Sequence, residues 1–321
     1  MTFLDASKAF DRIDHCLLFK KLISKNVPLF IIKLLAYWYT HQLMFIRWGN
    51  TFSSKFTVTN GVKQGGILSP VLFNVYMDDL SIALNESKIG GTLGGTLINH
   101  LCYADDLCLI SLSSAGMQKL LTICDKYATS HALLYNGQKS YSLCFKQTSI
   151  KFEVPILSLR LLEIPIVDQC KYLGIIISTK HCNFDLKRQM RKLYADTNIL
   201  VRKFSKCTAD VKCYLFKSYC SNLYCAPLWY DCTVTALKKL KVSYNNSLRR
   251  LLGIPKHNSA TEMFVNLNIP SFDELLRKYV YSFKSRVSNS SNLLLDNIVD
   301  SSLPLHSNIW SWWYSKLHVT G

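Results

Sequence analysis

The pattern of hydrophobic and polar positions changes near residue 180. Before this point, short strand-like apolar runs alternate with segments of helical spacing, which is typical of an α+β domain. After Thr179 the strand signals fade, and the apolar residues recur at helical spacing. We therefore predict a mixed domain over residues 1–180 and an all-helical region over residues 181–321.

Local patterns predict the individual elements. Ile13, Leu17, Leu18 and Leu22 share one helix face, and residues 43–48 and 52–59 alternate around Gly49-Asn50 as in a β-hairpin. Further helices are expected over residues 28–40, 70–85, 115–131, 183–207, 209–225, 233–252 and 272–286, and strand-like pieces over 140–145 and 170–178.

Residues 101–110, LCYADDLCLI, place Asp105 and Asp106 between two short apolar runs. Successive residues of a strand point to opposite faces, so both carboxylates can face one site only at the turn of a hairpin. Asp5 also ends a strand-like run, and three carboxylates converge if these strands are neighbours. Carboxylates in such a place need a compensating charge, which is typically Mg²⁺ bound by oxygen ligands. A solvated Asp-Asp turn is the alternative interpretation of the pair alone.

Charge indicates the class of partner. The chain of 321 residues has 38 Lys and Arg against 21 Asp and Glu, a net charge of +17, and 49% hydrophobic residues. Such an excess favours a polyanionic partner, of which nucleic acid is more plausible than an anionic membrane surface. The basic clusters after residue 180 are compatible with a solvated surface or with phosphate contacts.

The twelve cysteines contain no CxxC pair, so their spacing favours neither structural zinc nor a disulfide framework. We interpret them as reduced thiols of a protein in the cytoplasm or nucleus. No signal peptide or membrane span is evident, since the best apolar run, residues 28–39, is broken by Lys33.

Five segments resemble the ordered motifs of reverse transcriptases. They are FLDASKAFD (3–11), NGVKQGGILSPVLFNVYMDDL (60–80), YADD (103–106), NGQK (136–139) and KYLG (171–174). Their order and spacing are similar to the polymerase domain of non-LTR (LINE-type) retrotransposons, from palm motif A through the thumb. The resemblance implies a right-hand polymerase palm with an antiparallel sheet and helices, followed by an all-helical thumb.

The resemblance also implies residue roles. Asp5, Asp105 and Asp106 would hold two Mg²⁺ ions, or Mn²⁺, for transfer of dNTPs to a DNA primer on an RNA template. Lys139 would neutralise or protonate the leaving pyrophosphate. Phe10 would exclude a ribose 2′-OH, and backbone amides between Asp5 and Phe10 would receive the triphosphate. The nucleotide and template pocket would include Gln64 and Gly65, and the primer grip would be Tyr172, Leu173 and Gly174. The second acidic pair, Asp78-Asp79, is expected to be structural, at a helix end.

Members of this family have a fingers region before motif A, whereas Met1 stands four residues ahead of Asp5. We therefore expect a palm and thumb without fingers. Two hypotheses remain open at this point. One is an RNA-directed DNA polymerase of retrotransposon origin, and the other is a truncated, catalytically inactive relic that only binds nucleic acid.

Overall fold

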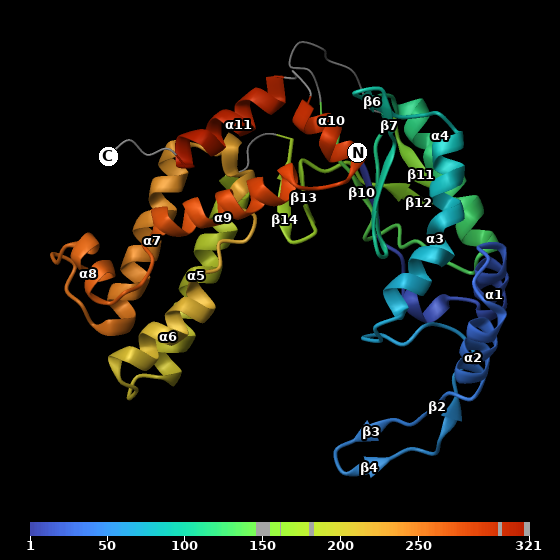
Figure 1. Ribbon diagram of the computed structural model, residues 1–321, viewed down its shortest axis with the longest axis horizontal. Helices are drawn as coiled ribbons and strands as arrows, with labels where there is room; N and C mark the ends of the chain where they lie inside the picture. The colour runs from blue at the N-terminus through green and yellow to red at the C-terminus, as the bar shows by residue number, and fades with distance from the viewer. Residues whose placement is uncertain (146–154, 161, 180–182, 301–303, 318–321) are drawn as a thin grey trace. The chain divides into compact units, whose positions relative to one another are not determined.

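The structure is a computed structural model that describes residues 1–145, 155–160, 162–179, 183–300 and 304–317 (Figure 1). The chain divides into two compact units, Met1–Val167 and Asp168–Gly321. The first, the N-terminal unit, mixes sheet and helix, and the second, the C-terminal unit, is helical apart from one hairpin. These contents confirm the predicted fold class, an α+β part followed by a helical part. The boundary expected at residue 180 falls outside the described residues.

A four-stranded antiparallel sheet is the framework of the N-terminal unit. Its strand order is β10-β1-β9-β8, so that the short strand at the start of the chain lies in the middle. The hydroxyls of Thr2 on β1 and Ser142 on β10 are both buried and lie 2.7 Å apart. The strands are β1 (Thr2–Leu4), β8 (His100–Tyr103), β9 (Asp106–Leu109) and β10 (Tyr141–Ser142).

The described part of this unit also contains four helices and a 3-10 turn. The apolar spacing of α3 buries Leu72, Tyr76, Leu80 and Leu84, which lie four residues apart on one helix face. This face shares a core with α1, α4 and the strand residues Leu4, Leu107 and Leu109. The elements are η1 (Phe10–Arg12), α1 (His15–Ser24), α2 (Leu29–Thr40), α3 (Ser69–Glu86) and α4 (Ser114–Ser130).

Two-stranded ribbons account for the remaining strands of the N-terminal unit. The predicted hairpin around Gly49-Asn50 is present, as two ladders that pair β2 with β5 and β3 with β4. The glycine-rich segment around residue 94 turns between β6 and β7. The ribbon strands are β2 (Leu43–Met44), β3 (Arg47–Trp48), β4 (Thr51–Phe52), β5 (Phe56–Thr57), β6 (Gly91–Leu93), β7 (Thr96–Ile98), β11 (Leu157–Leu159) and β12 (Leu162–Ile164).

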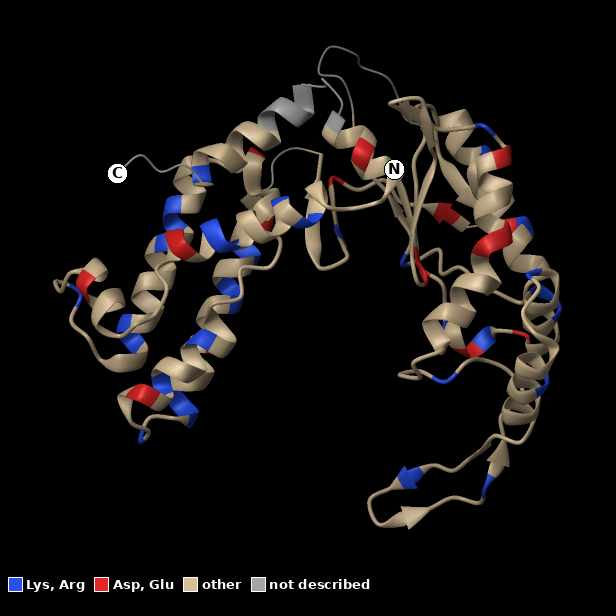
Figure 2. Cartoon of the chain, viewed as in Figure 1, with Lys and Arg blue, Asp and Glu red and all other residues tan. Residues whose placement is uncertain are grey.

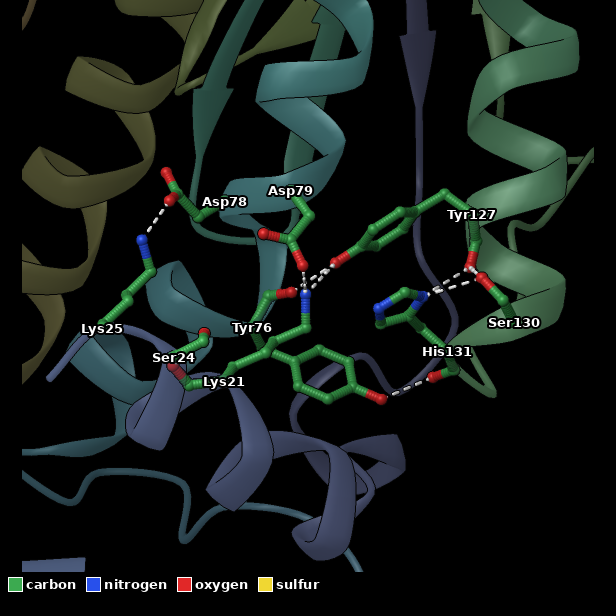
Figure 3. A network of polar contacts seen from close by, with 9 residues as sticks. All are labelled: Lys21, Ser24, Lys25, Tyr76, Asp78, Asp79, Tyr127, Ser130 and His131. Carbon is green, nitrogen blue, oxygen red and sulfur yellow. Dashed lines mark hydrogen bonds and ion pairs between the residues drawn. The ribbon is translucent and has the colours of Figure 1, made fainter. Parts of the chain in front are cut away.

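A buried lysine connects α1, α3 and α4 (Figure 3). The Lys21 ammonium pairs with Asp79, donates a hydrogen bond to the Tyr127 hydroxyl at 3.2 Å and lies over the rings of Tyr76 and Tyr127. Lys25 pairs with Asp78. The second acidic pair is thus structural, as expected. Its position in the middle of α3 rather than at a helix end corrects the prediction, because α3 continues to Glu86.

The C-terminal unit starts with the β13–β14 hairpin and continues with helices around their own core. Trp229, Phe216 and Tyr244 are among its largest buried side chains. Near the C-terminus, Trp313 is buried and donates a hydrogen bond to the Pro227 carbonyl at 2.8 Å. The elements are β13 (Gln169–Tyr172), β14 (Ile175–Ser178), α5 (Asn183–Lys203), α6 (Ala209–Cys220), η2 (Ala226–Asp231), α7 (Val234–Leu252), α8 (Ala260–Asn266), α9 (Phe272–Ser288), α10 (Leu293–Asp300) and α11 (Pro304–Leu317).

Further details differ from the sequence predictions. Ile13, expected on the face of the first helix, precedes α1, which begins at His15. The helix expected to reach residue 225 ends at Cys220. Cys225, with a left-handed φ of 61°, precedes the 3-10 turn η2, which begins at Ala226 and has Pro227 in its first turn. Ten of the cysteines are free thiols as expected, but Cys232 is disulfide-bonded. In the part of the chain that the structure describes, no helix is both long enough and apolar enough to cross a membrane.

Candidate active site

The sheet register brings the three predicted carboxylates to one edge. On β1 and β9, Phe3 pairs with Cys108 and Leu4 with Leu107, so the next position of this register sets Asp5 opposite Asp106. Asp105 lies in the two-residue turn between Tyr103 and Asp106, which pair as the last rung of β8 and β9. Ala104 in this turn has a φ of 53°, a left-handed conformation that is strained for a residue with a Cβ atom.

The charges of these carboxylates also bear on the pKa of Asp106. The pKa of Asp106 is raised above its ordinary value, first by partial burial and then by the negative charges of Asp105 and Asp5. Like charges held together disfavour ionisation, and a bound cation would remove this repulsion. The edge of the sheet therefore has the charge and the oxygen donors that suit a divalent cation.

The positions of the three carboxylate side chains are not those of a closed metal site. Among the described residues, no three His, Cys, Asp or Glu side chains converge into a group that could hold a metal ion. The donor chemistry and the mutual repulsion thus fit a cation, but the three side chains are not closed around one point. Metal binding at this edge would require the carboxylates to turn toward a common centre.

The backbone of Asp5 is held by the turn that contains Lys139. The Asn136 amide donates to the Asp5 carbonyl at 2.8 Å, and the Asp5 amide donates to the Ser140 hydroxyl at 3.2 Å. The Ser140 hydroxyl in turn donates to the Asn136 carbonyl at 2.7 Å. Lys139, whose side chain is exposed, therefore lies in a turn that is hydrogen-bonded directly to the backbone of Asp5.

Phe10 lies on η1, six residues beyond the end of β1, and is half-buried. Its ring stacks on Phe73 of α3, with centroids 4.6 Å apart and an angle of 18° between the planes. This contact fixes the ring from one side. The amide of Ser7, in the same segment, already donates to the Leu134 carbonyl at 2.8 Å. The Ser7 amide is therefore already paired, and the role of the backbone amides between Asp5 and Phe10 in binding a triphosphate stays a prediction.

Gly61 explains how the next loop reaches this segment. A Cβ atom at Gly61, whose φ is 88°, would lie 2.8 Å from the Asp11 Cα and 2.9 Å from the Phe10 carbonyl oxygen. The amide of Val62 donates to that carbonyl at 2.8 Å. Only glycine allows so close an approach at this φ.

Gln64 and Gly65 follow in the exposed part of this loop. The Gln64 side-chain amide donates to the Asp11 carboxylate at 3.2 Å, which joins the loop to η1. Gly65 has a φ of 79° and open space where a Cβ atom would be. The loop thus lies against the segment that carries Phe10, with Gly65 unobstructed.

Tyr172, Leu173 and Gly174 belong to the C-terminal unit, where they form the tip of the β13–β14 hairpin. Leu173 and Gly174 both have positive φ, at 44° and 83°, as a two-residue hairpin turn of type I′ requires. The Tyr224 hydroxyl donates to the Leu173 carbonyl at 2.9 Å, and a Cβ atom at Gly174 would meet the Tyr224 ring at 2.9 Å. Tyr224 therefore supports this turn.

Comparison with known protein families identifies the family of this chain. The family described as reverse transcriptase (RNA-dependent DNA polymerase) matches residues 1–177, which is more than half of the chain. The chain belongs to the reverse transcriptase family. Its reverse transcriptase domain thus includes all five motifs and every predicted site residue.

The relatives are proteins of mobile elements. The Retrovirus-related Pol polyprotein from type-2 retrotransposable element R2DM of Drosophila melanogaster is 32% identical over 179 residues, 54% of this chain and 17% of that protein. The probable RNA-directed DNA polymerase from transposon BS of the same species is 25% identical over 308 residues, 91% of this chain and 33% of that protein. These names confirm the resemblance to retrotransposon polymerases. The chain spans about a third or less of the length of these curated relatives.

Among solved structures, the telomerase of Candida tropicalis in complex with a TWJ fragment of telomeric RNA is similar. That likeness has a TM-score of 0.44 at 12% identity and covers 99% of this chain and 49% of the telomerase chain.

Sequence reasoning missed the residues that support the reverse transcriptase site. Asn136 and Ser140 fasten Asp5, Phe73 holds Phe10, and Tyr224 holds the Leu173 turn. Gly61 lies in the second motif, but nothing in the local sequence indicated its close approach to Phe10.

Proposed function

We propose that this chain is the polymerase part of an RNA-directed DNA polymerase, which transfers dNTPs to a DNA primer on an RNA template. The observation that carries the proposal is the position of Asp5, Asp105 and Asp106, coupled electrostatically at one edge of the sheet within a reverse transcriptase domain. The names of the relatives, which include RNA-directed DNA polymerases of transposons, support it.

In this proposal the three aspartates bind two Mg²⁺ ions, or Mn²⁺. When bound, such ions activate the primer hydroxyl and stabilise the charge on the leaving pyrophosphate. A bound cation would lower the raised pKa of Asp106, because it would offset the negative charges of Asp105 and Asp5. Asp5 directly after β1, Asp105 in the turn between β8 and β9, and Asp106 at the start of β9 would hold the ions at one edge of the sheet.

Other residues orient the substrates. Phe10, braced by Phe73, excludes a ribose 2′-OH beside the sugar of the incoming nucleotide. Lys139, on the turn fastened to Asp5, supplies a proton or a positive charge to the pyrophosphate. Gln64 and Gly65 line the nucleotide and template pocket, and the hairpin turn of Tyr172, Leu173 and Gly174 grips the primer end.

The C-terminal unit offers a basic surface for the nucleic acid, as the family's thumb does. A groove of about 590 Å³ between α5 and α7 is lined by Lys187, Arg191, Lys238 and Lys239 and by no acidic residue. Figure 2 shows Lys and Arg along both helices. Phosphates would replace condensed counterions there, so affinity falls steeply with salt. A template of RNA and a primer of DNA imply a location inside the cell, in the cytoplasm or the nucleus.

Primer extension on an RNA template tests the proposal. Wild-type protein with Mg²⁺ should extend the primer, and Asp105→Ala should reduce the rate at least about 100-fold, as loss of a group that stabilises transition-state charge does. Asp78→Ala is the matched control, because Asp78 pairs with Lys25 away from the site. Equal rates for wild type and Asp105→Ala would refute the assignment. Salt-dependent binding without any extension by wild type would favour the inactive relic.

A further inference from the structure

The ribbon between α2 and α3 has a surface that the polymerase assignment leaves unexplained. It runs through β2, β3, β4 and β5 and extends away from the end of α2 (Figure 1). Its large side chains are exposed, and Trp48 at the tip is 86% exposed. Apolar side chains gathered on a projecting ribbon mark a binding surface rather than ordinary protein exterior. The exposed apolar residues of the ribbon are Leu43, Met44, Phe45, Ile46, Trp48, Phe52 and Phe56.

One face of the ribbon combines aromatic rings with a cation. Arg47 pairs with Phe52 across the strands, and its guanidinium carbon lies 5.7 Å from the Phe52 ring centroid. The Phe45 ring meets the Phe52 ring edge-on, with centroids 5.1 Å apart. Arg47 also donates to the Gly49 carbonyl at 2.9 Å, which holds it against the tip. Trp48, one residue along the strand, points to the other face.

The backbone holds these side chains in place. Between the two ladders, Phe45 and Ile46 face the three residues 53–55, so the ribbon contains a β-bulge. The Ser53 hydroxyl accepts a hydrogen bond from the Ile46 amide at 2.9 Å, and the Ser53 amide donates to the Ile46 carbonyl at 2.9 Å. The two strands of the ribbon are therefore hydrogen-bonded to each other at the bulge. This backbone holds the aromatic rings in position without a bound partner.

Charge selects the class of partner. No Asp or Glu occurs anywhere from His15 to Met77, and Arg47 and Lys55 are the charged residues of the ribbon itself. Figure 2 shows Lys and Arg on the ribbon and no acidic residue. Stacking rings together with positive charge suit single-stranded nucleic acid, since every base has a face that stacks and every linkage has a phosphate. A surface that binds an apolar protein partner would have no reason to lack acidic residues.

We propose that this ribbon is an arm that binds single-stranded nucleic acid. Bases stack on Phe52 and Phe45 on one face and on Trp48 at the tip, while Arg47 and Lys55 contact the phosphates. The inference builds on the proposed function, since the strand is then the template as it approaches the polymerase. Binding needs no nucleotide incorporation, so the two proposals can fail separately.

Fluorescence anisotropy of the full chain with labelled oligo(U) or oligo(dT) of about 20 nucleotides, longer than one single-strand site, measures this binding. Loss of one stacking ring, in Trp48→Ala or in Phe52→Ala, should weaken the affinity about 5- to 30-fold. Trp48→Phe should restore most of it. Arg47→Gln should lower the slope of log affinity against log salt by about 0.7. Phe30→Ala, which removes a similarly exposed ring on α2, is the matched control and should leave the affinity unchanged.

Crosslinking gives an independent readout. Ultraviolet irradiation of the complex with 4-thiouridine RNA should attach the RNA to the peptide that contains Trp48 and Phe52. Unchanged affinity in both Trp48→Ala and Phe52→Ala would overturn the proposal. So would a change of oligomeric state in Trp48→Ala with unchanged affinity for RNA, because the ribbon would then be a protein interface.

Discussion

Replacement of either partner in the Lys21–Asp79 pair should have unequal effects on the N-terminal unit. The Lys21 side chain is only 9% exposed, whereas that of Asp79 is 54% exposed. Asp79→Asn leaves a buried ammonium without its counter-charge. Lys21→Met leaves a carboxylate that water can solvate, and the Tyr127 hydroxyl keeps its hydrogen bond to the Tyr76 carbonyl. We therefore expect loss of the Asp79 charge to destabilise the N-terminal unit more than loss of the Lys21 charge.

The magnitudes follow from the same contacts. Breaking a buried ion pair costs about 3–5 kcal/mol when the remaining charge is wholly without partners. Lys21 would retain the Tyr127 hydroxyl and two aromatic rings, which lowers our estimate for Asp79→Asn to about 2–3 kcal/mol. For Lys21→Met we expect about 1 kcal/mol, since the methionine chain can fill the space between the rings.

Native-state hydrogen exchange resolves the two units, which a global unfolding curve would not. In peptides of α1, α3 and α4, Asp79→Asn should lower protection about 30- to 160-fold and Lys21→Met about 5-fold. The double variant should resemble Lys21→Met, because no buried charge remains. Lys25→Met, which removes a more exposed pair with Asp78, is the control and should leave protection unchanged. Equal losses in the two single variants, or additive losses in the double variant, would refute the reasoning.

Two further predictions concern the site itself. Because the pKa of Asp106 is raised in the folded state, the stability it contributes is present in acid and lost as the pH rises through that pKa. Asp106→Asn should therefore raise the thermal midpoint of the metal-free protein at neutral pH but not in acid, and Mg²⁺ should stabilise wild type more than the variant. A variant no more stable than wild type at neutral pH would contradict the repulsion. Gly61→Ala forces a Cβ atom against the backbone of η1 at positive φ and should cost at least about 2–3 kcal/mol in urea unfolding. Gly49→Ala, with a φ of 59° and open space, should cost about 1 kcal/mol, and a similar loss in both would show that the contact with η1 is unimportant.

The sequence predicted what depends on local pattern. The hairpin at Asp105-Asp106 and the ribbon around Gly49-Asn50 are encoded by apolar runs and a turn between them. The role of Asp5 depended on the family resemblance, since its opposition to Asp106 comes from a register between strands about one hundred residues apart. No local rule reports such a register.

Support from distant residues was beyond the same reasoning. Asn136 and Ser140 hold Asp5 through groups that carry no sequence signal of this contact, and Tyr224 supports the Leu173 turn from the segment that follows α6. Asp78 and Asp79 were expected to be structural, but their partners on α1 depend on how two helices pack. Tertiary contacts of this kind become visible only in the folded chain.

The central place of β1 in its sheet has a consequence for folding. The contact between Thr2 and Ser142 spans 140 positions, so β1 cannot complete its pairing until that much of the chain has been made. At the usual pace of translation this delay is roughly 7–30 s. Phe3 and Leu4 lack their neighbours on β9 until residues 107 and 108 have been made, and β1 lacks its neighbour on β10 for the whole delay. We expect contacts of such long range to make the sheet, and with it the edge that carries Asp5, slow to form within the N-terminal unit.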